Sequence, residues 1–198
     1  MNIRSEPFLW IHLIGIALFP ALIGLTLISL AVGDSFPYVV ELPLLVATGI
    51  LPILVMQLLR TFDIFSVLIF SLQAEYLTDE QRQILSLLAS FKQKLVSIVA
   101  ALLMLATLWL LYCLSPLAVG IASFVPQWRS LGLAIASGSF LLSNLFFQIP
   151  LSVLLVLTAK ESERTSVEPY SPAEIEQNFI VPGIKVSKIL WFLKSSPK

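Results

Sequence analysis

Four long runs of apolar residues dominate this chain of 198 residues, and each run is long enough to cross a lipid bilayer. A spanning helix needs about 20 apolar residues, because the hydrocarbon core is roughly 30 Å thick and a helix rises ~1.5 Å per residue. Only 12% of the residues are charged, about half the share typical of a soluble domain. The sequence therefore predicts an all-α membrane protein with four transmembrane helices, at about residues 10–32, 38–59, 95–118 and 131–159.

The first run is predicted to remain in the protein as a transmembrane helix rather than to be removed as a secretory signal. Its apolar stretch, from Leu9 to Val32, is longer than the roughly 7 to 15 apolar residues of a signal peptide. Glu6 also lies close to Arg4, where a signal peptide is positively charged. The four helices are therefore assigned to one transmembrane domain, residues 1–159.

The long connection between the second and third spans is predicted to contain interfacial segments over residues 62–91, with one or two interfacial helices. Ile64–Leu72 is apolar but too short to cross the bilayer as a helix, so it is expected to lie along the interface. Thr78 and Gln81 have the spacing of a capping box, which predicts that a helix begins at Thr78. Apolar residues recur at helical spacing after it, which is typical of an amphipathic helix.

Residues 160–198 are predicted to form a short, partly disordered cytoplasmic tail. Its first part, residues 160–172, is rich in Glu, Ser, Thr and Pro, and such a composition buries too little apolar surface to fold. Ser171 and Glu174 have the spacing of a second capping box, which predicts a short helix. Ile184–Leu193 mixes apolar residues with lysines, so it either rests on an anionic leaflet or docks on the protein itself.

Basic residues near the ends of the spans are unequally shared between the two sides of the membrane. If the spans are threaded in order, one side carries Arg129 alone. Because cytoplasmic connections carry the excess of Lys and Arg, both termini are predicted to face the cytoplasm. The basic residues on that side are Arg4, Arg60, Arg82, Lys92, Lys94, Lys160 and Arg164.

His12 is the only histidine, and it lies near the cytoplasmic end of the first span. An imidazole can ligate a haem iron or a chlorophyll magnesium, which makes His12 a weak candidate for cofactor binding. One histidine offers no second ligand in a spacing pattern, so an interfacial polar residue is the preferred interpretation. We therefore expect no cofactor and no metal, and the lone Cys113 cannot form an internal disulfide.

The fourth span carries polar and small side chains at helical spacing. Ser137, Asn144 and Gln148 form a stripe that is interrupted by Leu141. The stripe either packs against neighbouring helices or lines a path for a substrate, and packing is the preferred interpretation. Two pairs of small residues four positions apart also favour close approach of helices, namely Gly132 with Ala136 and Ala134 with Gly138.

Charged groups near the midplane, which a proton- or ion-driven pump normally needs, are not evident in the sequence. Glu41 lies near the outer start of the second span and is expected to reach water, because it is close to the external boundary. No basic residue lies deep in any span to pair with it. Arg60 and Asp63, three residues apart at the end of the second span, are expected to form an ordinary solvated pair. These features weaken a transporter interpretation.

Signatures of enzymes and of nucleic-acid-binding proteins are missing from the sequence. It contains no zinc-protease motif, no nucleophile elbow and no phosphate-binding glycine loop. With one His and one Cys, catalytic triads are nearly impossible to assemble. The 12 basic and 12 acidic residues cancel, so no overall positive charge attracts nucleic acid. We expect neither an enzyme nor a nucleic-acid-binding protein.

Five short sequence motifs are distributed along nearly the whole chain: Ser5–Leu13, Ala31–Asp34, Tyr76–Arg82, Pro126–Arg129 and Phe179–Gly183. In these motifs the chain resembles a cyanobacterial family described as low-complexity tail membrane proteins. The motifs are structural rather than catalytic, so the resemblance assigns no catalytic residue. It implies a cyanobacterial plasma or thylakoid membrane.

The leading functional hypothesis is a non-enzymatic accessory or assembly factor for a membrane complex. It follows from the small-residue and amide face of the fourth span and from the capped, amphipathic segments expected on the cytoplasmic side. The expected partners are the lipid bilayer and either a membrane-protein complex or further copies of the chain. The alternative is a small-molecule transporter or channel subunit that works as an oligomer, since four helices alone rarely enclose a pore.

Overall fold

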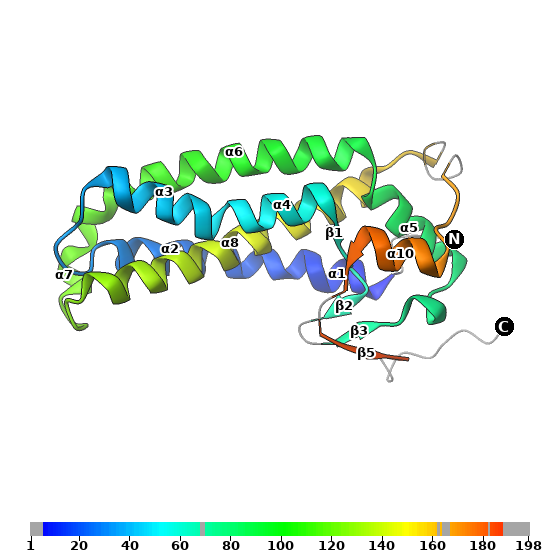
Figure 1. Ribbon diagram of the computed structural model, residues 1–198, viewed down its shortest axis with the longest axis horizontal. Coiled ribbons are helices and arrows are strands. Elements are labelled where there is room, and N and C mark those ends of the chain that lie inside the picture. The colour runs from blue at the N-terminus through cyan, green and yellow to red at the C-terminus, as the bar shows by residue number, and fades with distance from the viewer. Residues whose placement is uncertain (1–5, 68–69, 162, 164–166, 182, 188–198) are drawn as a thin grey trace.

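The computed structural model is a bundle of four long helices with a smaller body of short helices and strands at one end (Figure 1). It describes residues 6–67, 70–161, 163, 167–181 and 183–187. The predicted fold class, an all-α membrane protein with four transmembrane helices, is confirmed. The helical stretches that are long and apolar enough to cross a membrane are Pro7–Leu30, Tyr38–Leu59, Phe91–Ala122 and Arg129–Thr158.

Three of the four spans are divided into shorter helical pieces, and in each of these spans one piece after a break has a proline in its first two residues: Pro20, Pro52 and Pro116. Proline favours such breaks because it has no N–H to donate to the preceding turn. The first span consists of α1 (Pro7–Ile14), the 3-10 helix η2 (Gly15–Leu18) and α2 (Phe19–Leu30). The second consists of α3 (Tyr38–Gly49) and α4 (Leu51–Leu59), and the third of α6 (Phe91–Leu114), η4 (Ser115–Ala118) and α7 (Val119–Ala122).

The fourth span is one continuous helix, α8 (Arg129–Thr158), and it is the central helix of the bundle. It packs against α1, α2, α3 and α6. A Cβ added at Gly132 would lie 2.7 Å from the carbonyl oxygen of Ser29, so only glycine lets α2 approach α8 this closely. A Cβ at Gly49 would similarly lie 2.8 Å from the Phe140 ring, at the break between α3 and α4.

The two ends of the bundle differ in size and composition. The end that we call the loop end holds two short connections, residues 31–37 and 123–128. The opposite end carries a folded body, which we call the platform, formed by the described parts of residues 60–90 and 167–187 (Figure 1).

The platform contains two small sheets where the sequence predicted an interfacial segment. β1 (Thr61–Phe62) pairs in parallel with β4 (Phe179–Ile180). β3 (Phe70–Leu72) lies between β2 (Ser66–Val67), to which it is antiparallel, and β5 (Ile184–Val186), to which it is parallel. The segment Ile64–Leu72, predicted only to lie along the interface, thus contains β2 and β3, which pair with each other, and β3 also pairs with β5 of the tail.

Both predicted capping boxes are present, and both helices they begin belong to the platform. The hydroxyl of Thr78 accepts from the N–H of Gln81 at the start of α5 (Asp79–Leu88), and Ser171 and Glu174 repeat the arrangement at α10 (Pro172–Asn178). A short 3-10 helix, η3 (Ala74–Tyr76), precedes α5. The apolar face of α5 is buried in the platform core, where it packs with Phe65, Ile175 and Phe179. The amphipathic helix was predicted correctly, but its apolar face covers protein rather than lipid.

The tail supplies regular structure to the platform over the residues that the structure describes. α10, β4 and β5 all follow residue 171, and β5 docks on β3. Of the two interpretations of Ile184–Leu193, docking on the protein therefore applies to the described part, Ile184–Val186. The rest of that prediction, residues 188–193, lies outside the described residues, as do 162 and 164–166 of the expected linker.

Candidate functional site

A buried ion pair joins the second and fourth spans at the loop end. Arg129 Nε donates to Glu41 Oε1 at 2.5 Å, and Arg129 Nη2 donates to Glu41 Oε2. This two-point contact is the strongest arrangement of a guanidinium and a carboxylate. Arg129 exposes 8% of its surface and Glu41 exposes none. Because both charges are withdrawn from water, each depends on the other for compensation.

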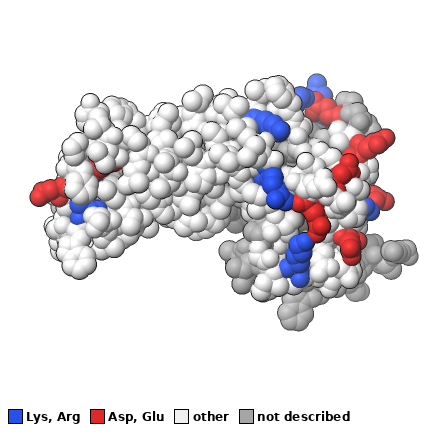
Figure 2. All heavy atoms as spheres, in the orientation of Figure 1, with Lys and Arg blue, Asp and Glu red and all other residues white. Residues whose placement is uncertain are grey.

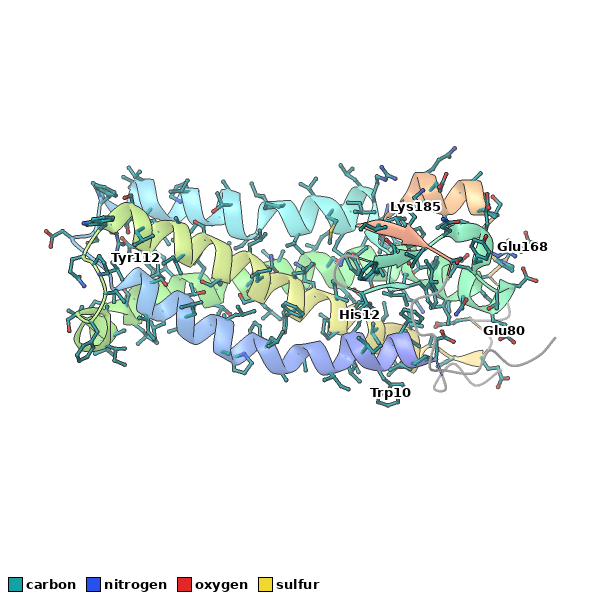
Figure 3. All side chains as sticks on the ribbon, turned by 90° about the horizontal axis from the view of Figure 1, so that it is seen from below. Trp10, His12, Glu80, Tyr112, Glu168 and Lys185 are labelled. Atoms are coloured by element: carbon teal, nitrogen blue, oxygen red, sulfur yellow. The ribbon has the colours of Figure 1, made fainter. Side chains whose placement is uncertain are left out.

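The same ion pair also fastens the other two spans. Arg129 Nη1 donates to the carbonyl oxygens of Leu30 and Val32, at 2.7 and 3.0 Å, and so satisfies the last turn of α2. Glu41 Oε1 accepts from the N–H of Phe36 at 2.8 Å. Tyr112 of α6 lies beside Glu41 at the loop end (Figure 3). Groups from all four spans therefore meet around this pair.

The prediction that Glu41 reaches water is wrong, and the reason is the position of its partner. Arg129 precedes the fourth apolar run and was therefore assigned to an aqueous connection. In the structure it is the first residue of α8, and its side chain turns inward. Glu41 and Arg129 are 88 residues apart, so no local pattern could have paired them.

A second cluster, which we call the polar seam, consists of Gln93, Asn144, Gln148, Ser152 and the carbonyl group of Gly49. Asn144 Nδ2 donates to the Gly49 oxygen at 3.1 Å, at the break between α3 and α4. Gln148 Nε2 donates to Asn144 Oδ1 at 2.9 Å. Ser152 Oγ donates to the carbonyl oxygen of Gln148 at 2.9 Å and accepts from Gln93 Nε2. The seam links α3, α6 and α8 through the interior of the bundle.

The structure thus brings together two of the three polar residues of the predicted stripe. Asn144 and Gln148 are buried and bonded to each other, whereas Ser137 is half-buried and lies outside the seam. The seam members missed by sequence reasoning are Gln93, Ser152 and the Gly49 carbonyl. Ser152 lies four residues after Gln148 and could have been found from that spacing, but Gln93 is on another helix and gave no such signal.

The two predicted pairs of small residues on α8 face in different directions. Gly132 and Ala136 are buried in the bundle, where Gly132 allows the close approach of α2. Ala134 and Gly138 are exposed, and within the part of the chain that the structure describes, nothing lies within 4 Å of a Cβ added to Gly138. The second pair therefore leaves a shallow, small-residue surface on the outside of the bundle.

His12 attaches the first span to the platform. Its Nε2 lies 2.8 Å from the carbonyl oxygen of Ile64, and since a carbonyl oxygen only accepts, this nitrogen is the donor. The imidazole ring also meets the Phe62 ring edge to face, with centroids 5.8 Å apart. Figure 3 shows His12 on the platform side of α1, with Trp10 pointing away from the bundle. The ring has a further hydrogen bond to the backbone of Ser66, so the polar contacts of His12 are made with the platform.

Arg60 and Asp63 do not form the predicted solvated pair, because Arg60 binds the tail and Asp63 is buried. Arg60 Nη2 donates to the carbonyl oxygens of Glu176 and Phe179, at 2.5 and 2.9 Å. Asp63 is buried, and its Oδ1 accepts from the N–H of Phe65 at 2.9 Å. Its Oδ2 has no hydrogen-bond partner among the described residues. Burial raises the pKa of the Asp63 carboxyl group to about 6.

A polar cleft of about 420 Å³ opens on the platform between η3, α10 and β5. Its charged lining residues are Glu75, Glu176 and Lys185, and the last two form an ion pair at 2.5 Å. Figure 2 shows charged side chains gathered on the platform, a smaller group at the loop end, and an uncharged belt between them. An uncharged belt is what a bilayer requires of the surface it surrounds.

Comparison with known proteins agrees with this architecture. A family model described as low-complexity tail membrane protein-like matches residues 5–191. No curated protein and no solved structure matches the chain. The match includes all four spans and the described platform, and it confirms the resemblance found in the sequence. The chain belongs to the low-complexity tail membrane protein-like family.

Proposed function

We propose that this protein is a non-enzymatic accessory or assembly factor that holds a partner membrane complex, with the platform as its contact body. The observation that supports this most is the way the platform is fixed to the bundle. A folded body attached at several points to a membrane anchor can hold a partner at a defined position and orientation.

Two contacts attach the platform to the start of the first span, and Arg60 joins the tail strand to the end of the second span. His12 of α1 contacts the Ile64 carbonyl, as described above. Gln81 Nε2, at the start of α5, donates to Glu6 Oε1 at 2.9 Å. Arg60, at the end of α4, holds the tail through the carbonyl oxygen of Phe179. Polar contacts of this kind give the platform one position relative to the spans.

The outward surface of α8 around Ala134 and Gly138 supports the same proposal within the bilayer. Small residues let two helix backbones come close, and association in lipid depends on such packing because the hydrophobic effect contributes little there. In this proposal the platform and this surface contact the same partner, either a membrane complex or a second copy of the chain.

We further propose that the platform and both termini face the cytoplasm of a cyanobacterial cell, in its plasma or thylakoid membrane. Support for the sidedness comes from the charge distribution: Arg60, Arg82 and Lys92 lie at the platform end. The loop end has Arg129, and its charge is engaged by Glu41. Cytoplasmic sides of membrane proteins carry the excess of basic residues.

The test is affinity purification from native membranes in two mild detergents, followed by identification of the co-purified proteins. Wild type should bring down the same partners in both detergents. Gly138→Leu should lose the partners, because the leucine fills the small-residue surface at a position where an added Cβ has nothing of the described chain within 4 Å. Gly24→Leu is the matched control, since a Cβ at Gly24 also has nothing within 4 Å but lies on α2. Recovery of the wild-type protein alone from both detergents would contradict the accessory role.

A second candidate function is a transporter or channel subunit that works as an oligomer. One observation favours it: the side-chain oxygens of Gln57, Gln93 and Gln148 are buried without a hydrogen-bond partner among the described residues. Asn144→Leu would remove the seam contact to the Gly49 carbonyl. Loss of solute flux in reconstituted vesicles, with the fold intact, would support transport over the accessory role.

A further inference from the structure

We propose that the platform-end third of the bundle holds a binding site for a small monovalent cation, formed by the side-chain oxygens of Gln57, Gln93 and Gln148. All three residues are at most 1% exposed. The Oε1 atoms of all three have no hydrogen-bond partner within the described chain. This inference does not depend on the accessory role, and it rests on hydrogen-bond directions that the polar seam itself determines.

The orientation of the Gln148 amide is fixed by a chain of donors that begins at a backbone carbonyl. The Gly49 oxygen can only accept, so the atom of Asn144 that lies 3.1 Å from it must be the amide nitrogen. The other end of Asn144 is then an oxygen, which can only accept from the nitrogen of Gln148, 2.9 Å away. Rotating the Gln148 amide by half a turn would place two oxygens together. The free end of the Gln148 amide is therefore its oxygen, Oε1, which has no hydrogen-bond partner among the described residues.

The orientation of the Gln93 amide is fixed in the same way. The single proton of the Ser152 hydroxyl is donated to the carbonyl oxygen of Gln148 at 2.9 Å. Toward Gln93 the hydroxyl can then only accept, so the Gln93 nitrogen faces it. The same nitrogen lies 3.5 Å from the hydroxyl oxygen of Ser97. Gln93 Oε1 is left as a second acceptor without a partner among the described residues. Gln93 lies on α6, beside Ser152, which is one helical turn after Gln148 on α8.

Gln57 is brought to the same level by the register between neighbouring helices. α4 and α8 both run from the loop end to the platform end, and Asn144 is level with Gly49. Eight residues of helix advance both chains by about 12 Å, which places Gln57 level with Ser152. Gln93 contacts Ser152 directly, and α4 packs against α6. Three buried acceptor oxygens, one from each of three packed helices, are thus at levels that differ by roughly one or two turns of the bundle.

The chemistry of this oxygen set selects a monovalent cation. Three amide oxygens and nearby serine hydroxyls carry partial negative charge, and none of the seam's side chains is charged. Carbonyl and hydroxyl oxygens of this kind replace the hydration shell of Na⁺ or K⁺ inside membrane proteins. Ca²⁺ and Mg²⁺ are normally held through carboxylates, which the set lacks. The expected ligand is therefore a small, partly dehydrated alkali cation. Titration of the protein with NaCl and with KCl distinguishes Na⁺ from K⁺.

The test is thermal unfolding of the full chain in detergent, followed by tryptophan fluorescence. NaCl or KCl is titrated against choline chloride at constant ionic strength, so that only the identity of the cation changes. At a hundredfold excess over the Kd, the bound cation should raise the unfolding midpoint by about 5–10 °C, and the rise should saturate. A rise of the unfolding midpoint with one alkali cation identifies that ion as the ligand. Equal midpoints in all three salts would overturn the proposal and would indicate that these oxygens are hydrated instead.

Two variants separate cation binding from general stability. Gln148→Met removes the acceptor but keeps the side-chain volume, and it should abolish the rise in midpoint. Ser143→Ala is the matched control on the same helix, because the Ser143 hydroxyl is already bonded to the carbonyl oxygen of Phe140 at 2.8 Å. It should keep the full rise, and loss of the rise in this variant would count against the site.

A direct measurement covers the case in which Gln148→Met does not fold. Bound Na⁺ exchanging with the wild-type protein broadens the ²³Na NMR line, and K⁺ should narrow the line again if the two ions share the site. An unbroadened ²³Na line in the presence of the folded chain, together with a midpoint that does not respond to K⁺, would overturn the proposal.

Discussion

Replacing Arg129 with glutamine should strongly destabilise the protein, because it leaves the Glu41 carboxylate buried without its partner. Glu41 exposes none of its surface, so water cannot take over the role of the guanidinium. Among the described residues, the N–H of Phe36 still donates to the carboxylate at 2.8 Å, and the Tyr112 side chain lies beside it, but neither carries a positive charge. The carbonyl oxygens of Leu30 and Val32 lose their donor at the same time.

The magnitude follows from these two losses. Removing one partner of a buried ion pair costs about 3–5 kcal/mol. Hydrogen bonds between membrane helices average about 0.6 kcal/mol each, so the two carbonyl contacts add about 1 kcal/mol. We therefore expect Arg129→Gln to lower the free energy of unfolding by about 4–6 kcal/mol. Combining it with Glu41→Gln removes both charges, and the double variant should lose only about 1–2 kcal/mol.

The assay is reversible unfolding in mixed micelles by titration with sodium dodecyl sulfate, read by tryptophan fluorescence. Wild type, the two single variants and the double variant form a thermodynamic cycle that isolates the coupling between Arg129 and Glu41. A loss below about 1 kcal/mol for Arg129→Gln would refute the reasoning. So would a double variant whose loss equals the sum of the single losses.

Three further predictions concern other parts of the fold. The pKa of Asp63 is raised from 3.8 to about 6, so its contribution to stability is full below pH 4 and is lost as the pH rises through 6. Asp63→Asn should therefore be more stable than wild type at pH 8, by about 1–3 kcal/mol. The variant should also flatten the pH profile of the unfolding midpoint between pH 4 and 6. Gly132→Ala should lower the unfolding midpoint, because its Cβ would overlap the Ser29 oxygen at a cost of about 1–3 kcal/mol. Gly138→Ala should leave the midpoint unchanged or raise it. Equal effects at the two glycines would contradict the packing described. Ser171→Ala should remove the cap of α10 and cost about 1 kcal/mol, detected as faster proteolytic cleavage of the tail than in wild type.

The transmembrane part of the fold was predictable because one physical requirement dominates it. Each span must cross hydrocarbon of fixed thickness, so its length and composition are visible in the sequence alone. The predicted second span, residues 38–59, coincides with Tyr38–Leu59. The third span begins earlier than predicted, at Phe91, because Ser90 caps the helix while Lys92 and Lys94 are already inside it.

The platform strands and the ion pair were not predictable because their causes are remote in the sequence. Strands of two or three residues, such as β1 and β5, are too short to show an alternating pattern. Arg60 contacts a carbonyl 119 residues away, and Arg129 contacts Glu41 across 88 residues. For the candidate site, spacing on α8 indicated Asn144 and Gln148, while the acceptors contributed by α4 and α6 became visible only in three dimensions.

The way the platform is put together also imposes an order on its biosynthesis. β1 and β3 are made early, but their parallel partners β4 and β5 follow the last transmembrane helix. At a translation rate of about 5–20 residues per second, the early strands wait roughly 5 to 20 seconds for the later ones. During that interval their hydrogen-bonding edges are open beside the newly inserted helices. A nascent chain released before the tail is complete would keep those edges open, which would mark it for proteolytic quality control.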